Sequence, residues 1–179
     1  EIEWILKEAR KYLSTEFELR RSDVKSAWRG WRPLAVDPYK KHSVSRDHVI
    51  AKNPETGVTF VTGGKWTTYR EMAQDVVDRI STVPCTTLTK TLNGGEGYSA
   101  NLAIRIAQRF ELDAASAKHL ARTYGVHAES VLFNASCAKL HPKYPYVEAE
   151  VAYACLREYA LTVSDVLTLR TRLAYLDRE

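Results

Sequence analysis

The fold of the first part of the chain is predicted from residues 61–70, which read Val61-Thr62-Gly63-Gly64-Lys65-Trp66-Thr67-Thr68-Tyr69-Arg70. The double glycine separates an apolar run typical of a strand from a segment with the apolar spacing of a helix. Thr68 and Glu71 have the spacing of a capping box, which predicts that the helix begins near Thr68. The stretch therefore predicts a strand, a tight turn and a helix.

The double-glycine turn is also a candidate binding site. Glycine lets a backbone approach a ligand closely, and a helix N-terminus presents unpaired N–H groups with a partial positive charge. Such a turn suits a phosphate, a carboxylate or the pyrimidine edge of a flavin. An ordinary strand-to-helix turn that needs glycine only for its geometry has the same pattern, and a glycine pair alone does not separate the two interpretations.

Two strands are predicted on the N-terminal side of the double glycine, at residues 44–51 and 58–62. The loop between them, residues 53–57, carries the Asn-Pro-Glu-Thr-Gly chemistry of a hairpin. Residues 24–32 are predicted to be extended, because Pro33 disfavours helical geometry at the residue before it. Before them, an apolar stripe predicts a helix within residues 2–13.

After Pro84 the pattern becomes helical. All four tryptophans precede this point and all three cysteines follow it, which places a domain boundary here. The predicted helices cover residues 99–110, 113–124, 127–138, 147–160 and 164–176. Three glutamates in this part are expected on a solvated helix face: Glu148, Glu150 and Glu158. The fold prediction is an α+β fragment, with partial strands and a hairpin from an oxidoreductase domain in residues 1–82 and an all-helical domain in residues 83–179.

Composition narrows the class of protein. The 179 residues are 45% hydrophobic and 27% charged, which excludes a disordered or collagen-like chain. No apolar run approaches the roughly 18–20 residues of a membrane-spanning helix. The cysteines are three and widely spaced, so a structural zinc site is not expected, and no metal is predicted.

The net charge of +4 is unevenly distributed. Residues 19–46 hold eight basic and two acidic side chains, which indicates an anionic partner for this segment. Arg32 and Arg46 could converge on a phosphate through their fixed forks of donors. They could equally be solvated surface arginines. His48 shares a strand face with Arg46, and we assign it no role because a lone histidine is more often a packing residue.

A nucleic-acid-binding module is the alternative function. Ala121 and Gly125 have the spacing of a helix-turn-helix centred on residues 113–138. The second helix would begin with His-Ala-Glu-Ser, which places Glu129 where phosphates would repel it. Helix–helix packing explains the two small residues equally well, so nucleic acid is not the expected partner.

Taken together, the motifs resemble the C-terminal portion of one family, the FAD-dependent (mitochondrial-type) glycerol-3-phosphate dehydrogenases. The matching stretches follow the family order and are residues 26–34, 43–49, 63–73, 146–151 and 170–176. The resemblance implies oxidation of sn-glycerol 3-phosphate to dihydroxyacetone phosphate, with hydride passed to FAD and electrons to quinone. It also implies a location at the mitochondrial inner membrane and contact with the membrane surface through the parent enzyme. It allows a homo-oligomer.

The resemblance also implies site residues. Arg32 and Arg46 correspond to substrate phosphate ligands, and Lys65 lies near both flavin and substrate. The turn that contacts the flavin corresponds to Gly63, Gly64, Lys65, Trp66 and Thr67. No residue of this chain is assigned as the catalytic base.

Two departures from the family pattern are equally informative. The chain has no GxGxxG fingerprint, which in the family binds the FAD pyrophosphate, and Leu169 stands where an arginine is expected. The chain also begins at Glu1 without a methionine. We therefore expect a fragment that is inactive alone and forms no tight FAD complex, with strands in residues 20–62 that miss their partners.

Overall fold

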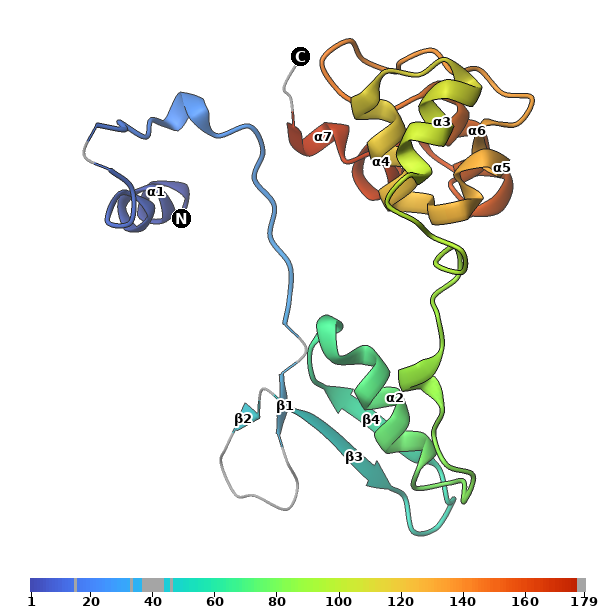
Figure 1. Cartoon of the computed structure of the whole chain (residues 1–179). Helices are drawn as coiled ribbons and strands as arrows, with labels where there is room; N and C mark the ends of the chain where they lie inside the picture. Colours follow the sequence, from blue (N-terminus) through green and yellow to red (C-terminus); the bar gives the residue numbers. More distant parts are fainter. Residues whose placement is uncertain (15, 33, 37–43, 46, 177–179) are drawn as a thin grey trace. The chain divides into compact units, whose positions relative to one another are not determined.

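The computed structural model describes residues 1–14, 16–32, 34–36, 44–45 and 47–176 (Figure 1). The chain forms two compact units. Arg29–Lys90 is one unit, and Glu1–Trp28 together with the part from Thr91 onward forms the other. The predicted domain division between residues 82 and 83 stays a prediction.

The unit Arg29–Lys90 is built on two antiparallel strand pairs and one helix. Its elements are β1 Ala35–Val36, β2 Val44–Ser45, β3 His48–Lys52, β4 Thr59–Gly63, a 3-10 turn Trp66–Thr68, α2 Tyr69–Val77 and a 3-10 turn Thr87–Thr89. β1 pairs with β2, and β3 pairs with β4. α2 runs alongside the β3–β4 hairpin (Figure 1). Arg79 fastens the end of this helix to β3 by donating from Nη1 to the Ile50 carbonyl at 3.1 Å.

The β3–β4 hairpin confirms the sequence prediction. The Asn53 side chain accepts from the N–H groups of Glu55 at 2.8 Å and Thr56 at 3.1 Å, which closes the turn locally. Gly57 follows with φ of 72°, a conformation that glycine adopts without strain. The register pairs His48 with Gly63 at the open end of the hairpin.

The predicted capping box at the start of α2 is wrong. Thr68 occupies the N-cap position, but its φ and ψ of −105° and 15° differ from the extended geometry of a capping residue, and its side chain caps no N–H. Its hydroxyl instead donates to the Lys65 carbonyl at 3.1 Å. Because residues 66–68 form a 3-10 turn, the Thr68 hydroxyl points back toward Lys65 and bonds within this turn. It is therefore not available to cap α2.

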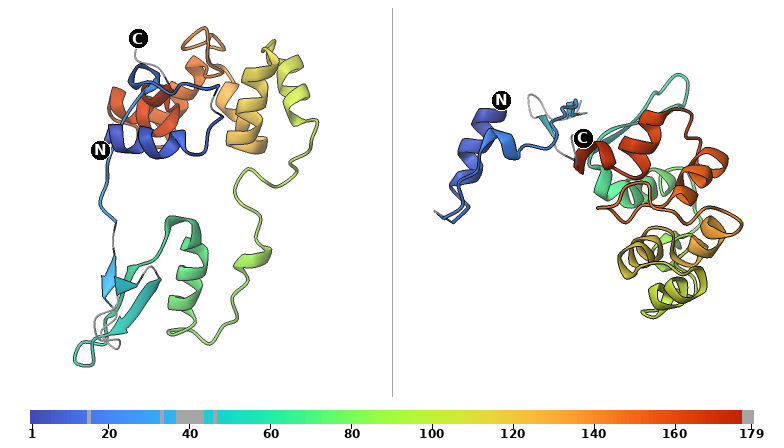
Figure 2. Two further views of the ribbon diagram at one scale, coloured as in Figure 1. Left: turned by 90° about the vertical axis from the view of Figure 1, so that its left-hand side faces the viewer. Right: turned by 90° about the horizontal axis from the view of Figure 1, so that it is seen from above.

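The second unit is helical, as predicted. Its elements are α1 Ile2–Arg10, a 3-10 turn Arg21–Asp23, α3 Leu102–Phe110, α4 Ala114–Tyr124, a 3-10 turn Gly125–His127, α5 Ala128–Leu132, α6 Glu148–Arg157, a π-helix Asp165–Arg170 and α7 Leu173–Leu176. Figure 2 shows α3 to α6 from two further sides, gathered into one bundle. Two antiparallel strand pairs in one unit, one of them a hairpin, and a helical bundle in the other confirm the α+β class.

The core of the bundle is aliphatic. Leu102, Ile106, Leu120, Leu132 and Val147 are each at most 1% exposed and form one cluster. Their side chains come from α3, α4, α5 and the N-cap of α6, so burying them fixes these helices against one another.

The structure departs most from the predicted helices over residues 127–138 and 164–176. The helix expected over residues 127–138 ends at Leu132, and Asn134 has a φ of 57° that a continuing helix does not allow. The helix expected over residues 164–176 is divided into the π-helix and α7, with Arg172 at a φ of 61° between them.

Gly125 marks a close backbone contact. Val126 donates its N–H to the Gly94 carbonyl at 2.9 Å, and a Cβ on Gly125 would lie 1.9 Å from that carbonyl oxygen. The turn at residues 93–97 is thereby held directly against the end of α4. A side chain at position 125 would separate the two, so glycine is required here.

Glu150 corrects the expectation of a solvated glutamate face on α6. It is 2% exposed, whereas its neighbour Glu148 is exposed. Across the described residues, no helix has the length and apolar character needed to cross a membrane. The same part of the chain contains no group of three or more His, Cys, Asp or Glu side chains arranged to hold a metal ion.

Candidate functional site

The double-glycine turn lies where β4 gives way to α2. Gly63 and Gly64 have φ values of 79° and 80°, in the left-handed region. Residues with a Cβ adopt this region at a cost, and two in succession are typical of glycine. The turn therefore reverses direction sharply enough to place Lys65 at the start of the 3-10 turn and α2 back along the hairpin.

Packing within the unit explains both glycines. A Cβ on Gly63 would lie 2.8 Å from the Ala35 Cβ, and a Cβ on Gly64 would lie 2.6 Å from the Met72 Sδ. The space beside each Cα is thus filled by β1 and by α2. This supports the geometric interpretation of the pair, and the role of Gly63 and Gly64 in cofactor binding stays a prediction.

The residues that follow the double glycine are exposed and carry unused donors. Within the described chain, no hydrogen bond involves the N–H groups of Lys65, Trp66 or Thr67. The Trp66 ring is 89% exposed and lies 6.3 Å from the Tyr69 ring. Successive unpaired N–H groups beside a lysine and an aromatic face fit the electron-rich pyrimidine edge of a flavin.

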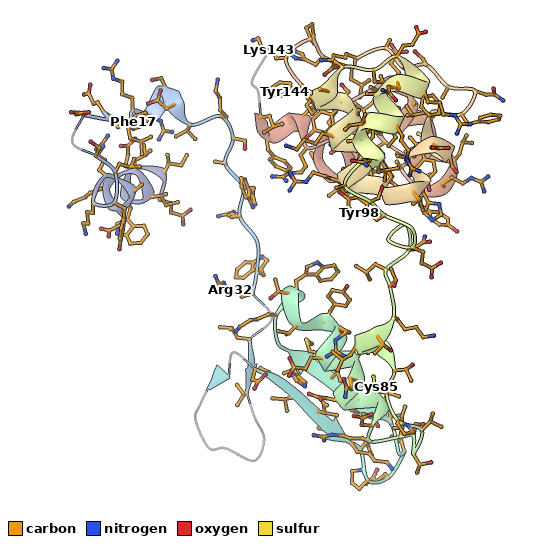
Figure 3. The ribbon with its side chains drawn as sticks, viewed as in Figure 1. Phe17, Arg32, Cys85, Tyr98, Lys143 and Tyr144 are labelled. Carbon is orange, nitrogen blue, oxygen red and sulfur yellow. The ribbon has the colours of Figure 1, made fainter. Side chains whose placement is uncertain are left out.

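Arg32, the described member of the predicted phosphate pair, is free to bind an anion. Its side chain is exposed (Figure 3), and in the described part of the chain its guanidinium forms no ion pair. Nothing lies within 4 Å of a Cβ built on Gly30, so the backbone beside Arg32 leaves open space. Arg46 lies outside the described residues, and the convergence of the two arginines stays a prediction.

His48 is the residue that sequence reasoning missed. Its imidazole is 14% exposed and lies between two carboxylates, with Nε2 2.8 Å from Asp75 Oδ2 and Nδ1 3.3 Å from Asp47 Oδ1. Its Cβ is also the third-nearest atom to a Cβ built on Gly64, at 3.2 Å. A signal was present in the sequence, because Asp75 lies on the apolar face of α2 that Met72 and Val76 define.

The helix required by the nucleic-acid alternative is short. α5 contains five residues, and Glu129 in its first turn forms an ion pair with Arg109 of α3. A recognition helix needs a longer exposed face with donors for base edges and phosphates. The fold at residues 113–138 instead buries Ala121 in the helical core and Gly125 against the turn at residues 93–97.

Comparison with known proteins places the chain in a family. Residues 85–179 match the family described as the C-terminal domain of alpha-glycerophosphate oxidase. The chain belongs to this family. The matched residues include the helices α3 to α7.

The whole chain is also similar to named enzymes. It is 43% identical over 194 residues to the glycerol-3-phosphate dehydrogenase, mitochondrial, of Mesocricetus auratus, and 41% identical over 194 residues to that of Homo sapiens. Each alignment covers 99% of this chain and 26% of the relative. A plant relative, glycerol-3-phosphate dehydrogenase SDP6, mitochondrial, of Arabidopsis thaliana, is 38% identical over all of this chain and 32% of its own length. The resemblance to mitochondrial glycerol-3-phosphate dehydrogenases is confirmed, and the chain spans about a quarter to a third of the length of these relatives.

Proposed function

We propose that the chain acts as part of an FAD-dependent glycerol-3-phosphate dehydrogenase that oxidises sn-glycerol 3-phosphate to dihydroxyacetone phosphate. The observation that carries the proposal is the 43% identity over 99% of the chain to the enzyme named glycerol-3-phosphate dehydrogenase, mitochondrial, of Mesocricetus auratus. Because the chain spans only a fraction of the relatives, we propose that it is inactive alone. The domain division at residues 82 and 83 belongs to the same proposal.

In this proposal Arg32 and Arg46 hold the substrate phosphate. A dianion needs at least two cationic donors when it leaves water, and guanidinium groups offer paired donors in a fixed plane. Arg32 supports this role because it is exposed, forms no ion pair with any of the described residues, and lies beside the open space at Gly30. Lys65 adds a third cation at the double-glycine turn, where it can contact both phosphate and flavin.

The turn that includes Gly63 and Gly64 positions the flavin edge in this proposal. FAD, when bound, would supply the hydride acceptor. The N–H groups of Lys65, Trp66 and Thr67 would donate to its pyrimidine edge, which gains negative charge on reduction, so these donors favour the reduced form. Electrons would then pass to quinone. The enzyme would lie at the mitochondrial inner membrane, contact the membrane surface and be able to form a homo-oligomer.

A chimeric enzyme tests the proposal. This chain replaces the aligned segment of the Mesocricetus auratus enzyme, and the chimera is assayed for glycerol-3-phosphate oxidation with a quinone analogue. Arg32→Ala and Arg46→Ala should each lower kcat/KM by about tenfold to a hundredfold, since each removes charge-assisted hydrogen bonds. Arg29→Ala is the matched control, because Arg29 is exposed in the same segment but alternates to the other face.

The outcomes separate clearly. Unchanged kcat/KM in both test variants would contradict the phosphate assignment. An inactive chimera that folds and holds FAD would contradict the proposed reaction. The isolated 179-residue chain should show no tight FAD binding by calorimetry, and stoichiometric tight binding would show that the chain carries a complete cofactor site.

A further inference from the structure

We propose that His48 and Asp75 form a positioning clamp that holds the double-glycine turn, and Lys65 with it, in its binding geometry. The inference rests on the proposed function, because it assigns a purpose to the geometry of that turn. His48 begins β3 and Asp75 lies in the middle of α2, so their contact joins the two elements that flank the turn.

The contact is short and sheltered. Nε2 of His48 lies 2.8 Å from Oδ2 of Asp75, a close polar contact that is an ion pair when the imidazole is protonated. The His48 side chain is 14% exposed, which shelters the contact from competition with water. The Asp75 carboxylate is 45% exposed, so it remains hydrated on its outer side and pays a smaller desolvation cost.

The clamp acts at the turn because His48 contacts it twice. Its backbone pairs with Gly63 in the hairpin register, and its Cβ lies beside Gly64. Met72, one turn before Asp75 on α2, lies on the same side of Gly64, where a built Cβ would be 2.6 Å from the Met72 Sδ and 3.2 Å from the His48 Cβ. Gly64 therefore faces both a β3 residue and an α2 residue, and the ring–carboxylate contact sets the distance between those two elements.

This arrangement assigns His48 to positioning and not to proton transfer. Both ring nitrogens face carboxylate oxygens, Nε2 that of Asp75 and Nδ1 that of Asp47 at 3.3 Å. A general base needs a ring nitrogen directed at the proton that it removes. Neither nitrogen is available, so the effect of His48 on the site passes through the turn.

Two amide substitutions separate the clamp from simple space filling. The side-chain nitrogen of a glutamine can occupy the position of the histidine Nε2, whereas that of an asparagine reaches only the position of Nδ1. His48→Gln should therefore keep the contact with Asp75, and His48→Asn should lose it. Asp75→Ala removes the acceptor, and Glu71→Ala is the matched control because Glu71 is an exposed carboxylate on the same helix.

The first measurement uses the 179-residue chain alone. Hydrogen exchange of the sheet-paired amides of β3 and β4 should accelerate by about tenfold in His48→Asn and Asp75→Ala as this end of the hairpin opens more often, and should stay unchanged in His48→Gln and Glu71→Ala. Circular dichroism confirms that each variant remains folded. Equal exchange in all four variants, or equal effects of His48→Gln and His48→Asn, would overturn the clamp. This result does not depend on enzymatic activity.

The second measurement uses the chimera with the Mesocricetus auratus enzyme. His48→Asn and Asp75→Ala should lower kcat by about 10- to 100-fold, the cost of misplacing a contact by a fraction of an ångström to an ångström, and should shift the flavin absorption bands. His48→Gln should leave both kcat and the flavin absorption bands as they are in the unsubstituted chimera. An inactive parent chimera argues against the proposed function, whereas an active one whose kcat and spectrum ignore His48→Asn argues against the clamp alone.

Discussion

The imidazole of His119 on α4 contacts the buried carboxylate of Glu150 on α6, with 2.7 Å between Nε2 and Oε1. The same oxygen accepts from the Tyr124 hydroxyl at 3.2 Å, and the other oxygen accepts from the Val147 N–H at 2.8 Å. Glu150 thus has donors on both oxygens and joins α4 to the first turn of α6. Burial, with the Glu150 charge second, raises the pKa of Tyr124, so this hydroxyl stays a donor.

His119→Ala should therefore destabilise the chain strongly. It removes one of three donors from a carboxylate that is 2% exposed, and leaving a buried acceptor short of a partner typically costs about 1–3 kcal/mol of unfolding free energy. Urea denaturation measures the loss. Glu148→Ala, on the exposed face of the same helix, should change the unfolding free energy by less than about 0.5 kcal/mol. Equal effects of the two substitutions would contradict the bonded network.

Gly125→Ala tests the contact between α4 and the turn at residues 93–97. A Cβ there would lie 1.9 Å from the Gly94 carbonyl oxygen, and the φ of 58° is itself unfavourable for alanine. The substitution should cost more than about 2 kcal/mol, because backbone must shift on both sides.

Gly30→Ala is its control, since nothing lies within 4 Å of that Cβ. This variant should melt within a few degrees of the unsubstituted chain, with a slight gain from the stiffer unfolded state. Thermal melts followed by circular dichroism compare the two. A Gly125→Ala variant as stable as Gly30→Ala would show that the turn does not pack as described.

Asp113→Ala should weaken the chain in a pH-dependent way. Asp113 caps α4 by accepting from Ala115 N–H at 3.0 Å and Ser116 N–H at 3.1 Å. The Ser116 hydroxyl at 2.8 Å is the main cause that lowers the Asp113 pKa from 3.8 to about 2. A carboxyl group whose pKa is lowered on folding contributes stability above its unfolded pKa and loses it as pH falls through its folded pKa.

The cost of Asp113→Ala should accordingly be about 1 kcal/mol at pH 7, typical of a lost cap, and should shrink between pH 4 and pH 2. Urea midpoints of both proteins at each pH measure the difference. Glu148→Ala serves again as the control carboxylate. A difference that stays constant from pH 7 to pH 2 would contradict the charged cap.

Local sequence chemistry predicted the elements whose cause is local. The hairpin follows from Asn53 and Gly57, which close its loop by themselves, and the turn after β4 follows from Gly63 and Gly64. The start of α2 was misjudged because residues 66–68 form a 3-10 turn, in which the Thr68 hydroxyl bonds backward to Lys65.

Contacts between distant residues were beyond prediction. Glu150 looks like one of several surface glutamates until His119, 31 residues earlier, is brought against it by helix packing. His48 likewise looks like a lone histidine, since its partner Asp75 lies on another element. The free energy of burying a charged side chain depends on such partners, which periodicity does not reveal.

Cys85 should be a reactive thiol whose reactivity depends on Thr87. Its Sγ lies 3.0 Å from the Thr87 Oγ1, and this hydrogen bond is the main cause that lowers the pKa of the Cys85 thiol. Arg70 donates from Nη1 to the same hydroxyl at 2.9 Å, which holds it in place.

Because the thiolate is the nucleophile, Thr87→Val should shift the pH–rate profile of iodoacetamide alkylation at Cys85 to higher pH and slow the reaction at pH 7. Mass spectrometry of the modified peptide gives the rate. Thr89→Val, two residues further along the same turn, is the control, and an unchanged profile in Thr87→Val would contradict the assigned cause.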